Sequence, residues 1–238
     1  MLPAGPPIQK RKLSDDVRAR LLAMIENGQT RPGDVLPSER ELMEQMAVGR
    51  PAIREAMQAL ERTGLIEIRH GERARVAEPS VGRMVDQVSQ SMKHLLLHSP
   101  ATLEHLKETR LAFELEMVRV AARRVSDSDI RRLEATLRDQ TAAVADLARF
   151  RVLDGQFHRD IATISGNPIW AALSDALFHW LNDFHVDLVS APGAEQLTLT
   201  EHRNVIDAIQ KRNPELAEAM MADHLNRAND LYRKTGRR

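Results

Sequence analysis

The sequence predicts a mainly α-helical protein in two parts: an N-terminal winged helix-turn-helix over residues 1–78 and an all-α helical bundle over residues 83–238. Two observations predict this division. Apolar residues recur at helical spacing along most of the chain, and strand-like alternation is confined to residues 65–77. The stretch Glu78-Pro79-Ser80-Val81-Gly82 interrupts the pattern, and we place a linker at residues 79–82.

The N-terminal part predicts three helices. The first spans residues 14–27, with Ser14 as its N-cap. Ser38 and Glu41 have the spacing of a capping box, which marks the start of a second, shorter helix. Ala47-Val48-Gly49 then predicts a tight turn. The second and third helices would therefore form a helix-turn-helix.

One apolar stripe on the third helix decides which of its side chains face outward. The stripe consists of Ile53, Ala56, Met57 and Leu60. Arg50 and Arg54 lie one turn apart at the start of the helix, clear of the stripe. These positions enter the major groove in a helix-turn-helix, where the arginine fork suits guanine or phosphate. We predict DNA contacts by Arg50 and Arg54 and a backbone contact by Arg40; a solvated helix face is the alternative for any single arginine.

Two short strands are expected next, at residues 65–68 and 73–77, joined by His70-Gly71-Glu72. This hairpin would be a wing with Arg73 and two further arginines about its tip. Because glycine has no side chain, Gly71 would let the backbone approach a phosphate or a minor groove closely.

The run PSERELM…VGRPAIREAMQALERTGLIEIRHG, residues 37–71, resembles the winged helix-turn-helix of GntR-family bacterial transcription regulators. The resemblance implies that the three arginines contact DNA backbone and bases, while His70 and Gly71 reach the groove from the wing. Pro51 and Ala52 stand where hydroxyl side chains are common in the family, which leaves the operator sequence open. We expect a homodimer that reads two half-sites of double-stranded operator DNA.

Composition narrows the function classes. The chain has 34 basic and 34 acidic residues, so only the placement of charge supports DNA binding. Acids such as Glu41, Glu44, Glu55 and Glu61 would have to lie away from the DNA or pair with neighbours. Without cysteine, disulfides and thiolate metal sites are excluded. No apolar run approaches the ~20 residues that span a bilayer, so we expect a cytoplasmic protein with no membrane partner.

The second part predicts seven helices separated by clear breaks. Ser126 and Asn213-Pro214 are suitable helix starts, and Ser99-Pro100 and Gly166-Asn167-Pro168 are breaks. We expect helices at residues 82–97, 102–124, 127–146, 148–165, 168–190, 195–212 and 214–234.

Four polar residues in this bundle are candidate metal ligands. Asp154 and His158 are four residues apart on one helix and point the same way, while His202 and His224 lie on two later helices. Apolar neighbours at helical spacing indicate that the histidines face inward. Three imidazoles and a carboxylate would suit zinc, nickel or copper, with manganese also possible. A hydrogen-bonded core histidine is the alternative for each.

Residues 100–230 resemble the FCD ligand-binding domain of the FadR branch of the GntR family. The resemblance implies that Asp154, His158, His202 and His224 bind a divalent metal, most simply zinc. Members that bind fatty-acyl ligands lack these metal ligands, so a small polar acid is the expected effector. Arg110 would clamp its carboxylate, although an ion pair with Glu114 one turn away is an equal alternative.

The wing-to-linker stretch GERARV, residues 71–76, resembles members that respond to sialic acid, and uronates and gluconate are competing effectors. The expected function is a ligand-responsive repressor with a metal-assisted pocket for a small sugar acid or other carboxylate. Two other readings stay open at this point. The metal could activate water in an enzyme that acts on a small acid, or it could be structural with no effector role.

Overall fold

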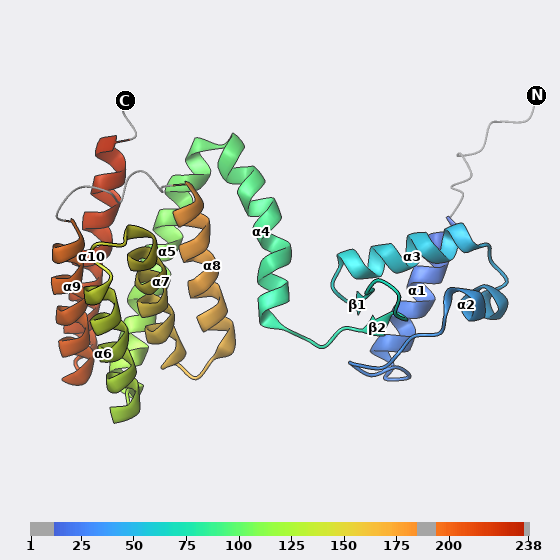
Figure 1. The fold of residues 1–238 in the computed structure, drawn as a ribbon, viewed down its shortest axis with the longest axis horizontal. Helices are drawn as coiled ribbons and strands as arrows, with labels where there is room; N and C mark the ends of the chain where they lie inside the picture. Colours follow the sequence, from blue (N-terminus) through green and yellow to red (C-terminus); the bar gives the residue numbers. More distant parts are fainter. Residues whose placement is uncertain (1–11, 185–193, 236–238) are drawn as a thin grey trace, which may run out of the picture. The chain divides into compact units, whose positions relative to one another are not determined.

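The computed structural model describes residues 12–184 and 194–235, and within them the chain forms ten helices and one two-stranded sheet (Figure 1). Its contacts divide the chain into two compact units, Met1–Gln87 and Val88–Arg238. This division falls inside helix α4 (Val81–His98) instead of at the predicted linker, residues 79–82. The reason is that the first two turns of α4 contact the N-terminal unit through Arg83 and Gln87.

The N-terminal unit is the predicted winged helix-turn-helix. Its elements are α1 (Leu13–Glu26), α2 (Glu39–Met46), α3 (Arg50–Arg62), β1 (Ile66–Glu67) and β2 (Arg75–Val76). The two strands pair antiparallel, with Ile66 opposite Val76. The predicted stripe of α3 is buried in full and packs against Leu21 of α1 and Leu42 of α2. This core holds α3 with its opposite face toward solvent.

The predicted capping box and the glycine after α3 are confirmed, whereas the predicted cap of the first helix is wrong and the helix predicted at residues 127–146 ends at Ala142. Ser38 and Glu41 form the capping box of α2, and Ala47 ends that helix in the left-handed region at φ 53°. Gly64 takes φ 71° just beyond the end of α3. The prediction for Ser14 is wrong, because α1 begins at Leu13 with Lys12 as its N-cap and Ser14 is buried in the first turn.

The wing is shorter in regular structure than the sequence predicts. Each strand has two residues instead of four or five. Residues of the expected second strand also pair with the segment before α2. Leu36 N donates to Ala74 O at 2.8 Å, and Val35 forms a bridge with Arg75. Gly71 at the tip has φ 78°, a conformation that favours glycine.

The second unit is the predicted all-α bundle. Its remaining helices are α5 (Pro100–Arg124), α6 (Asp127–Ala142), α7 (Leu147–Thr163), α8 (Pro168–Phe184), α9 (Ala194–Gln210) and α10 (Pro214–Thr235). Ser126 caps α6 as predicted. The predicted last turns of the helix at 168–190 lie outside the described residues. Among the described helices, none is long and apolar enough to cross a membrane.

The core of the bundle positions the candidate metal ligands. Helix α5 packs along α10, and α7 packs along α8 and α6. Phe157, Ile161, Val205 and Met221 are buried at the centre, next to the histidines in sequence or one turn away. The ring of Phe157 stacks on that of His202, with ring centres 3.8 Å apart. The apolar neighbours therefore turn the three histidines inward.

Candidate DNA interface and candidate metal centre

The exposed face of α3 carries two of the arginines assigned to DNA. Arg50 and Arg54 project from its first two turns, and the Arg54 side chain is 61% exposed. Both contact Glu39 at the start of α2: Arg54 Nε donates to Glu39 Oε1 at 3.0 Å, and Arg50 Nε lies 3.6 Å from Oε2. The start of α2 and the first two turns of α3 thus bring one anion and two cations together at the outer surface.

The other arginines assigned to DNA are also paired with acids. Arg40 Nη1 donates to Glu44 at 2.9 Å, and Arg73 Nη2 donates to Glu41 at 3.0 Å. Hydrogen bonds from Ser38, together with Arg73 and Arg40, lower the pKa of Glu41, so it is ionised at neutral pH. Glu39, Glu41 and Glu44 thus all pair with neighbouring arginines. DNA phosphates would replace carboxylates as partners of these cations.

The wing tip is open to solvent. His70 and Gly71 are both exposed, at the turn between β1 and β2. The structure therefore leaves the backbone at Gly71 accessible to a large partner. Arg73 lies on the same wing and reaches Glu41 in the first turn of α2.

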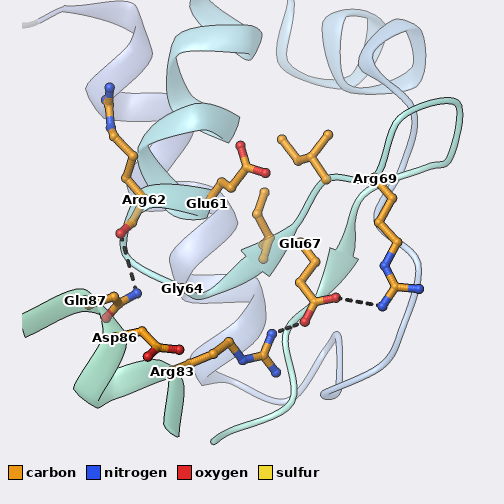
Figure 2. A pocket seen from close by; sticks show the side chains of 10 residues that line it. Glu61, Arg62, Gly64, Glu67, Arg69, Arg83, Asp86 and Gln87 are labelled. Carbon is orange, nitrogen blue, oxygen red and sulfur yellow. Dashed lines mark hydrogen bonds and ion pairs between the residues drawn. The ribbon is translucent and has the colours of Figure 1, made fainter. Parts of the chain in front are cut away.

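A groove of about 350 Å³ lies between the end of α3, β1 and the start of α4 (Figure 2). Arg83 forms an ion pair with Glu67 at its edge, and Gln87 Nε2 donates to Arg62 O at 3.5 Å. Gln87 also covers Gly64, where an added Cβ would lie 2.3 Å from Nε2. These contacts fasten the first turns of α4 to the end of α3, which explains why they belong to the N-terminal unit.

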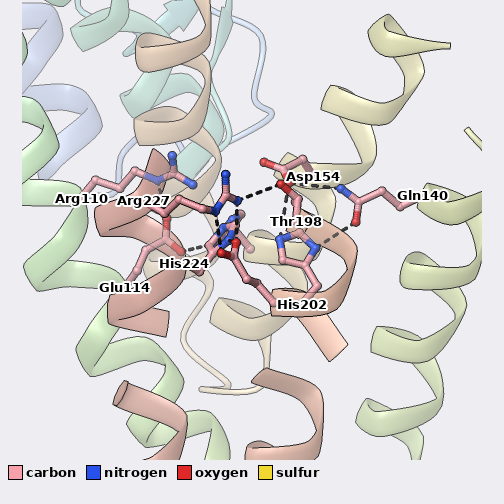
Figure 3. A network of polar contacts seen from close by, with 10 residues as sticks. Arg110, Glu114, Gln140, Asp154, Thr198, His202, His224 and Arg227 are labelled. Atoms are coloured by element: carbon pink, nitrogen blue, oxygen red, sulfur yellow. Dashed lines mark hydrogen bonds and ion pairs between the residues drawn. The ribbon is translucent and has the colours of Figure 1, made fainter. Parts of the chain in front are cut away.

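Three buried histidines converge in the bundle from three helices (Figure 3). His158 comes from α7, His202 from α9 and His224 from α10. One ring nitrogen of each lies within 4.8 Å of the others. In a tetrahedral site with zinc–nitrogen bonds of ~2.0–2.1 Å the ligand nitrogens are ~3.3–3.4 Å apart, so a small inward movement of these side chains would let all three bind a single ion.

The tautomer of each histidine is fixed by an outer partner. His158 Nδ1 contacts Glu114 Oε2, His202 Nδ1 lies 2.9 Å from Gln140 Oε1, and His224 Nδ1 lies 2.8 Å from Glu201 Oε2. Carboxylate and amide oxygens only accept, so each Nδ1 is the donor and each Nε2 keeps a lone pair when the ring is neutral. Metal-binding histidines have this arrangement.

Two of the Nε2 atoms are left without a hydrogen-bond partner. Over the part of the chain that the structure describes, Nε2 of His158 and Nε2 of His202 are buried and unsatisfied. Leaving a buried acceptor unpaired costs about 1–3 kcal/mol, and native proteins keep few such atoms. A metal ion is a partner that both lone pairs could share, so the residues present fit a divalent cation.

Asp154 lies at the same site. Its Oδ1 is 3.4 Å from His202 Nε2 and accepts a hydrogen bond from Gln140 Nε2 at 3.1 Å. Gln140 on α6 therefore holds both His202 and Asp154, with its two amide atoms used for different partners. Figure 3 shows the three side chains, from α6, α7 and α9, each in contact with the other two. Asp154 is thereby placed against His202, while the described residues whose ligand atoms all lie within 4.8 Å of one another are the three histidines.

Burial favours the neutral imidazole at His202 and His224. It is the largest influence on His202, whose pKa lies well below its usual value, and the neighbouring His224 and His158 lower it further. Burial also lowers the pKa of His224, although Glu201 opposes the shift. Neutral rings at pH 7 are the form that binds a metal.

Arg110 forms the ion pair that was the alternative to ligand contact. Its Nε donates to Glu114 Oε1 at 2.5 Å, and its guanidinium lies 5.5 Å from the centre of the Phe178 ring. Burial would raise the pKa of Glu114, but Arg110 and His158 outweigh it and hold the pKa at about 2. The charged form of Glu114 is therefore available to orient His158.

A similar pair supports the third histidine. Arg227 donates to both oxygens of Glu201, from Nε and from Nη2 at 2.5 Å each, and Nη2 also reaches Thr198 Oγ1 at 3.0 Å. Glu201 precedes His202 in the chain, but no pattern in the sequence identifies Arg227 as the partner of Glu201 or Gln140 as the partner of His202. Their roles follow only from the packing of helices that are far apart in sequence.

Gly155 gives the site a testable packing requirement. An added Cβ would lie 2.6 Å from two atoms of the Phe178 ring, which faces His158 with ring centres 6.4 Å apart. We expect Gly155→Ala to lower stability by about 1–3 kcal/mol, since overpacking outweighs the gain of alanine in a helix. Thermal melts check this. Gly82→Ala, which meets only Ser80 at 3.6 Å, is the matched control and should leave the melting temperature unchanged or raise it.

Comparison with known proteins agrees with both units. Residues 13–76 match the model of bacterial regulatory proteins of the gntR family, and residues 105–227 match the FCD domain. The HTH-type transcriptional repressor NanR of Cronobacter sakazakii is 40% identical over 228 residues, covering 92% of this chain and 85% of that protein. The repressor of the same name from Salmonella newport is 38% identical over 240 residues, covering 98% and 90%.

A solved structure shares the architecture. The chain is similar to Streptococcus agalactiae GntR, with a TM-score of 0.64 and 27% identity over 90% of this chain and 97% of that one. The sequence relatives span nearly all of the protein, and the two family models match its two units separately. The chain therefore belongs to the GntR family of bacterial transcription regulators, among the members that carry an FCD domain.

Proposed function

We propose that this regulator is a repressor that releases its operator when a small sugar acid binds beside a divalent metal, most simply zinc. The observation that carries the metal is the pair of buried, unpartnered Nε2 atoms of His158 and His202. Repression is supported by the relatives, which are transcriptional repressors at 38–40% identity. Membership of a family of transcription regulators accounts for the DNA-binding unit, which a metal-dependent enzyme would leave unexplained. Such membership implies no enzymatic activity.

The ligand set supports an accessible ion. Asp154, His158, His202 and His224 would hold it, and the bound ion would supply open positions for a carboxylate or hydroxyl of the effector. Nickel and manganese are alternatives to zinc. The outer partners orient the imidazoles, and burial favours the neutral form of His202 and His224. Arg110 stands beside the site and would contribute its charge to attracting an acid, in addition to its pair with Glu114.

Sialic acid is the first effector to test, because the sequence of the wing and linker resembles sialic-acid-responsive members. Uronates and gluconate carry the same carboxylate and hydroxyl groups. The effector would change operator affinity only if it bound one arrangement of the protein more tightly than the other. Coupling of ~1–3 kcal/mol is typical and would suffice for de-repression.

On the DNA side, we propose that two copies bind two half-sites related by approximate two-fold symmetry. In each copy, Arg40, Arg50 and Arg54 would contact the major groove and its backbone, while the wing residues His70, Gly71 and Arg73 would reach an adjacent groove. The exposure of the three arginines supports this assignment. We propose that the helical unit makes the dimer contact.

Metal removal separates a sensor from a structural site. We expect protein treated with EDTA to stay folded and bind operator DNA, but to lose its response to sialic acid, glucuronate or gluconate. Circular dichroism, gel shifts and a thermal-shift screen with and without added zinc measure the three properties. Loss of helical signal on chelation would favour a structural metal instead. An equal response to the acids with and without zinc would overturn the metal-assisted pocket.

A further inference from the structure

Glu39 lies where an acid would be expected to weaken DNA binding. It is the first residue of α2, and its carboxylate stands between the two arginines at the start of α3. Arg54 Nε donates to both of its oxygens, at 3.0 and 3.3 Å, and Arg50 Nε is 3.6 Å from Oε2. One acid therefore contacts both arginines that are proposed to read the operator.

The atoms in contact indicate what this acid does. Both arginines meet Glu39 through Nε, so the carboxylate occupies the inner edge of each guanidinium. The terminal nitrogens form the fork that pairs with O6 and N7 of guanine. The acids beside Arg40 and Arg73 differ, since they engage the terminal nitrogens Nη1 and Nη2. Glu39 thus contacts each guanidinium through Nε, on the side away from the end of the fork. Glu44 and Glu41 instead contact terminal nitrogens, of Arg40 and Arg73.

Stability gives no sufficient reason for this arrangement. The side chains of Glu39 and Arg54 are 37% and 61% exposed, and ion pairs at such surfaces contribute little to folding. Arginine has a long side chain with many rotamers, and holding it in one orientation before binding lowers the entropy lost on contact with a base. A nearby carboxylate also weakens the attraction of both arginines for phosphates of any sequence.

We propose that Glu39 is a specificity-determining positioning residue of the DNA-binding surface. It orients the forks of Arg50 and Arg54 toward base edges and suppresses their binding to DNA of unrelated sequence. This inference rests on the proposed function, because it requires that Arg50 and Arg54 contact operator bases. The new element is that Glu39, an acid among the arginines, raises the ratio of operator affinity to non-specific affinity.

The test uses the full chain and two DNA probes of equal length. One probe is the duplex that the wild-type protein enriches from a random-sequence pool, and the other is a scrambled version of it. Fluorescence anisotropy at one fixed salt concentration gives both affinities. For Glu39→Gln we expect affinity for the scrambled probe to rise several-fold and the operator-to-scrambled ratio to fall about tenfold.

Two further variants separate orientation from charge. Glu39→Asp keeps the charge but is one methylene shorter, so we expect its ratio to fall as well. Glu44→Gln removes the same charge from the same helix and leaves the Glu39 contacts intact. It should raise both affinities in parallel and leave the ratio unchanged. Because Glu39→Asp retains an acid at the start of α2, it serves as the test if Glu39→Gln melts at a much lower temperature.

The outcomes are distinguishable. If wild-type protein selects a sequence but the ratio is unchanged in Glu39→Gln and Glu39→Asp, the role of Glu39 is wrong and the proposed function stands. Equal changes of the ratio in Glu39→Gln and Glu44→Gln would also overturn it, since charge alone would then explain the effect. If wild-type protein enriches no sequence, the proposed function itself fails.

Discussion

We expect Arg54→Ala to lower operator affinity by about 1–3 kcal/mol, or roughly 5- to 150-fold, the contribution of a good bidentate base contact. Affinity for unrelated DNA should change less, because that binding depends on the sum of phosphate contacts. The fold should be unaffected, since the Arg54 side chain is largely exposed and the buried stripe of α3 is untouched. Gel shifts with operator and scrambled duplexes, beside thermal melts, measure these effects.

A matched control lies on the same helix. Arg62→Ala removes an arginine from the last turn of α3, away from the turn with α2, and should leave operator affinity within about twofold of wild type, as one weak phosphate contact would. Unchanged gel shifts for Arg54→Ala at low ionic strength would remove this residue from the DNA interface. A loss of equal size for operator and scrambled DNA would make it a phosphate contact.

The fold could be predicted from the sequence because its signals are local. The capping boxes at Ser38 and Ser126, and the glycine after α3, mark helix ends through residues at most a few positions apart. Ser14 shows the limit of such signals. Any residue with a short polar side chain near a helix start is a candidate cap, but here the backbone turn begins at Lys12 and buries Ser14 inside the helix.

The division of the chain could not be predicted in this way. Pro79 and Gly82 interrupt the periodic pattern, and the sequence therefore places a linker there. The structure divides the chain later, because Arg83 and Gln87 contact β1 and the end of α3. A break in a pattern marks the end of an element. Whether the next helix packs with the preceding unit depends on contacts between residues about 15 to 25 positions apart.

Of the candidate metal centre, the sequence could predict the proposed ligands but not the residues that hold them in place. Imidazole and carboxylate are uncommon on apolar helix faces, so inward-facing histidines are visible in sequence. Gln140 and Arg227 look like ordinary polar residues of amphipathic helices. Their roles depend on which turn of α6 faces α9 and which turn of α10 faces Glu201, a register that no local pattern specifies. Arg110 and Glu114 lie one turn apart on the same helix, and that spacing permits the ion pair without showing whether the guanidinium turns to Glu114 or to a ligand.

His202→Ala should produce the largest effect on the bundle. We expect metal affinity to fall more than about a hundredfold, because outer partners alone contribute about 10- to 100-fold and His202 would be a direct ligand. The response to a sugar acid should be lost with the metal. Operator affinity should stay within a few-fold of wild type, since the residues proposed to contact DNA lie in the other unit. Metal analysis after dialysis, calorimetry with zinc and gel shifts measure these three properties.

The control separates the loss of a ligand from the loss of a buried side chain. His202 is fully buried and stacks on Phe157, so its removal also leaves a cavity that lowers stability. Gln140→Leu keeps His202 and its packing but removes the amide that holds His202 and Asp154. We expect a loss of metal affinity of about 10- to 100-fold for this variant. If both variants bind zinc as wild type does, the histidines form a hydrogen-bonded core and the effector must bind without the metal.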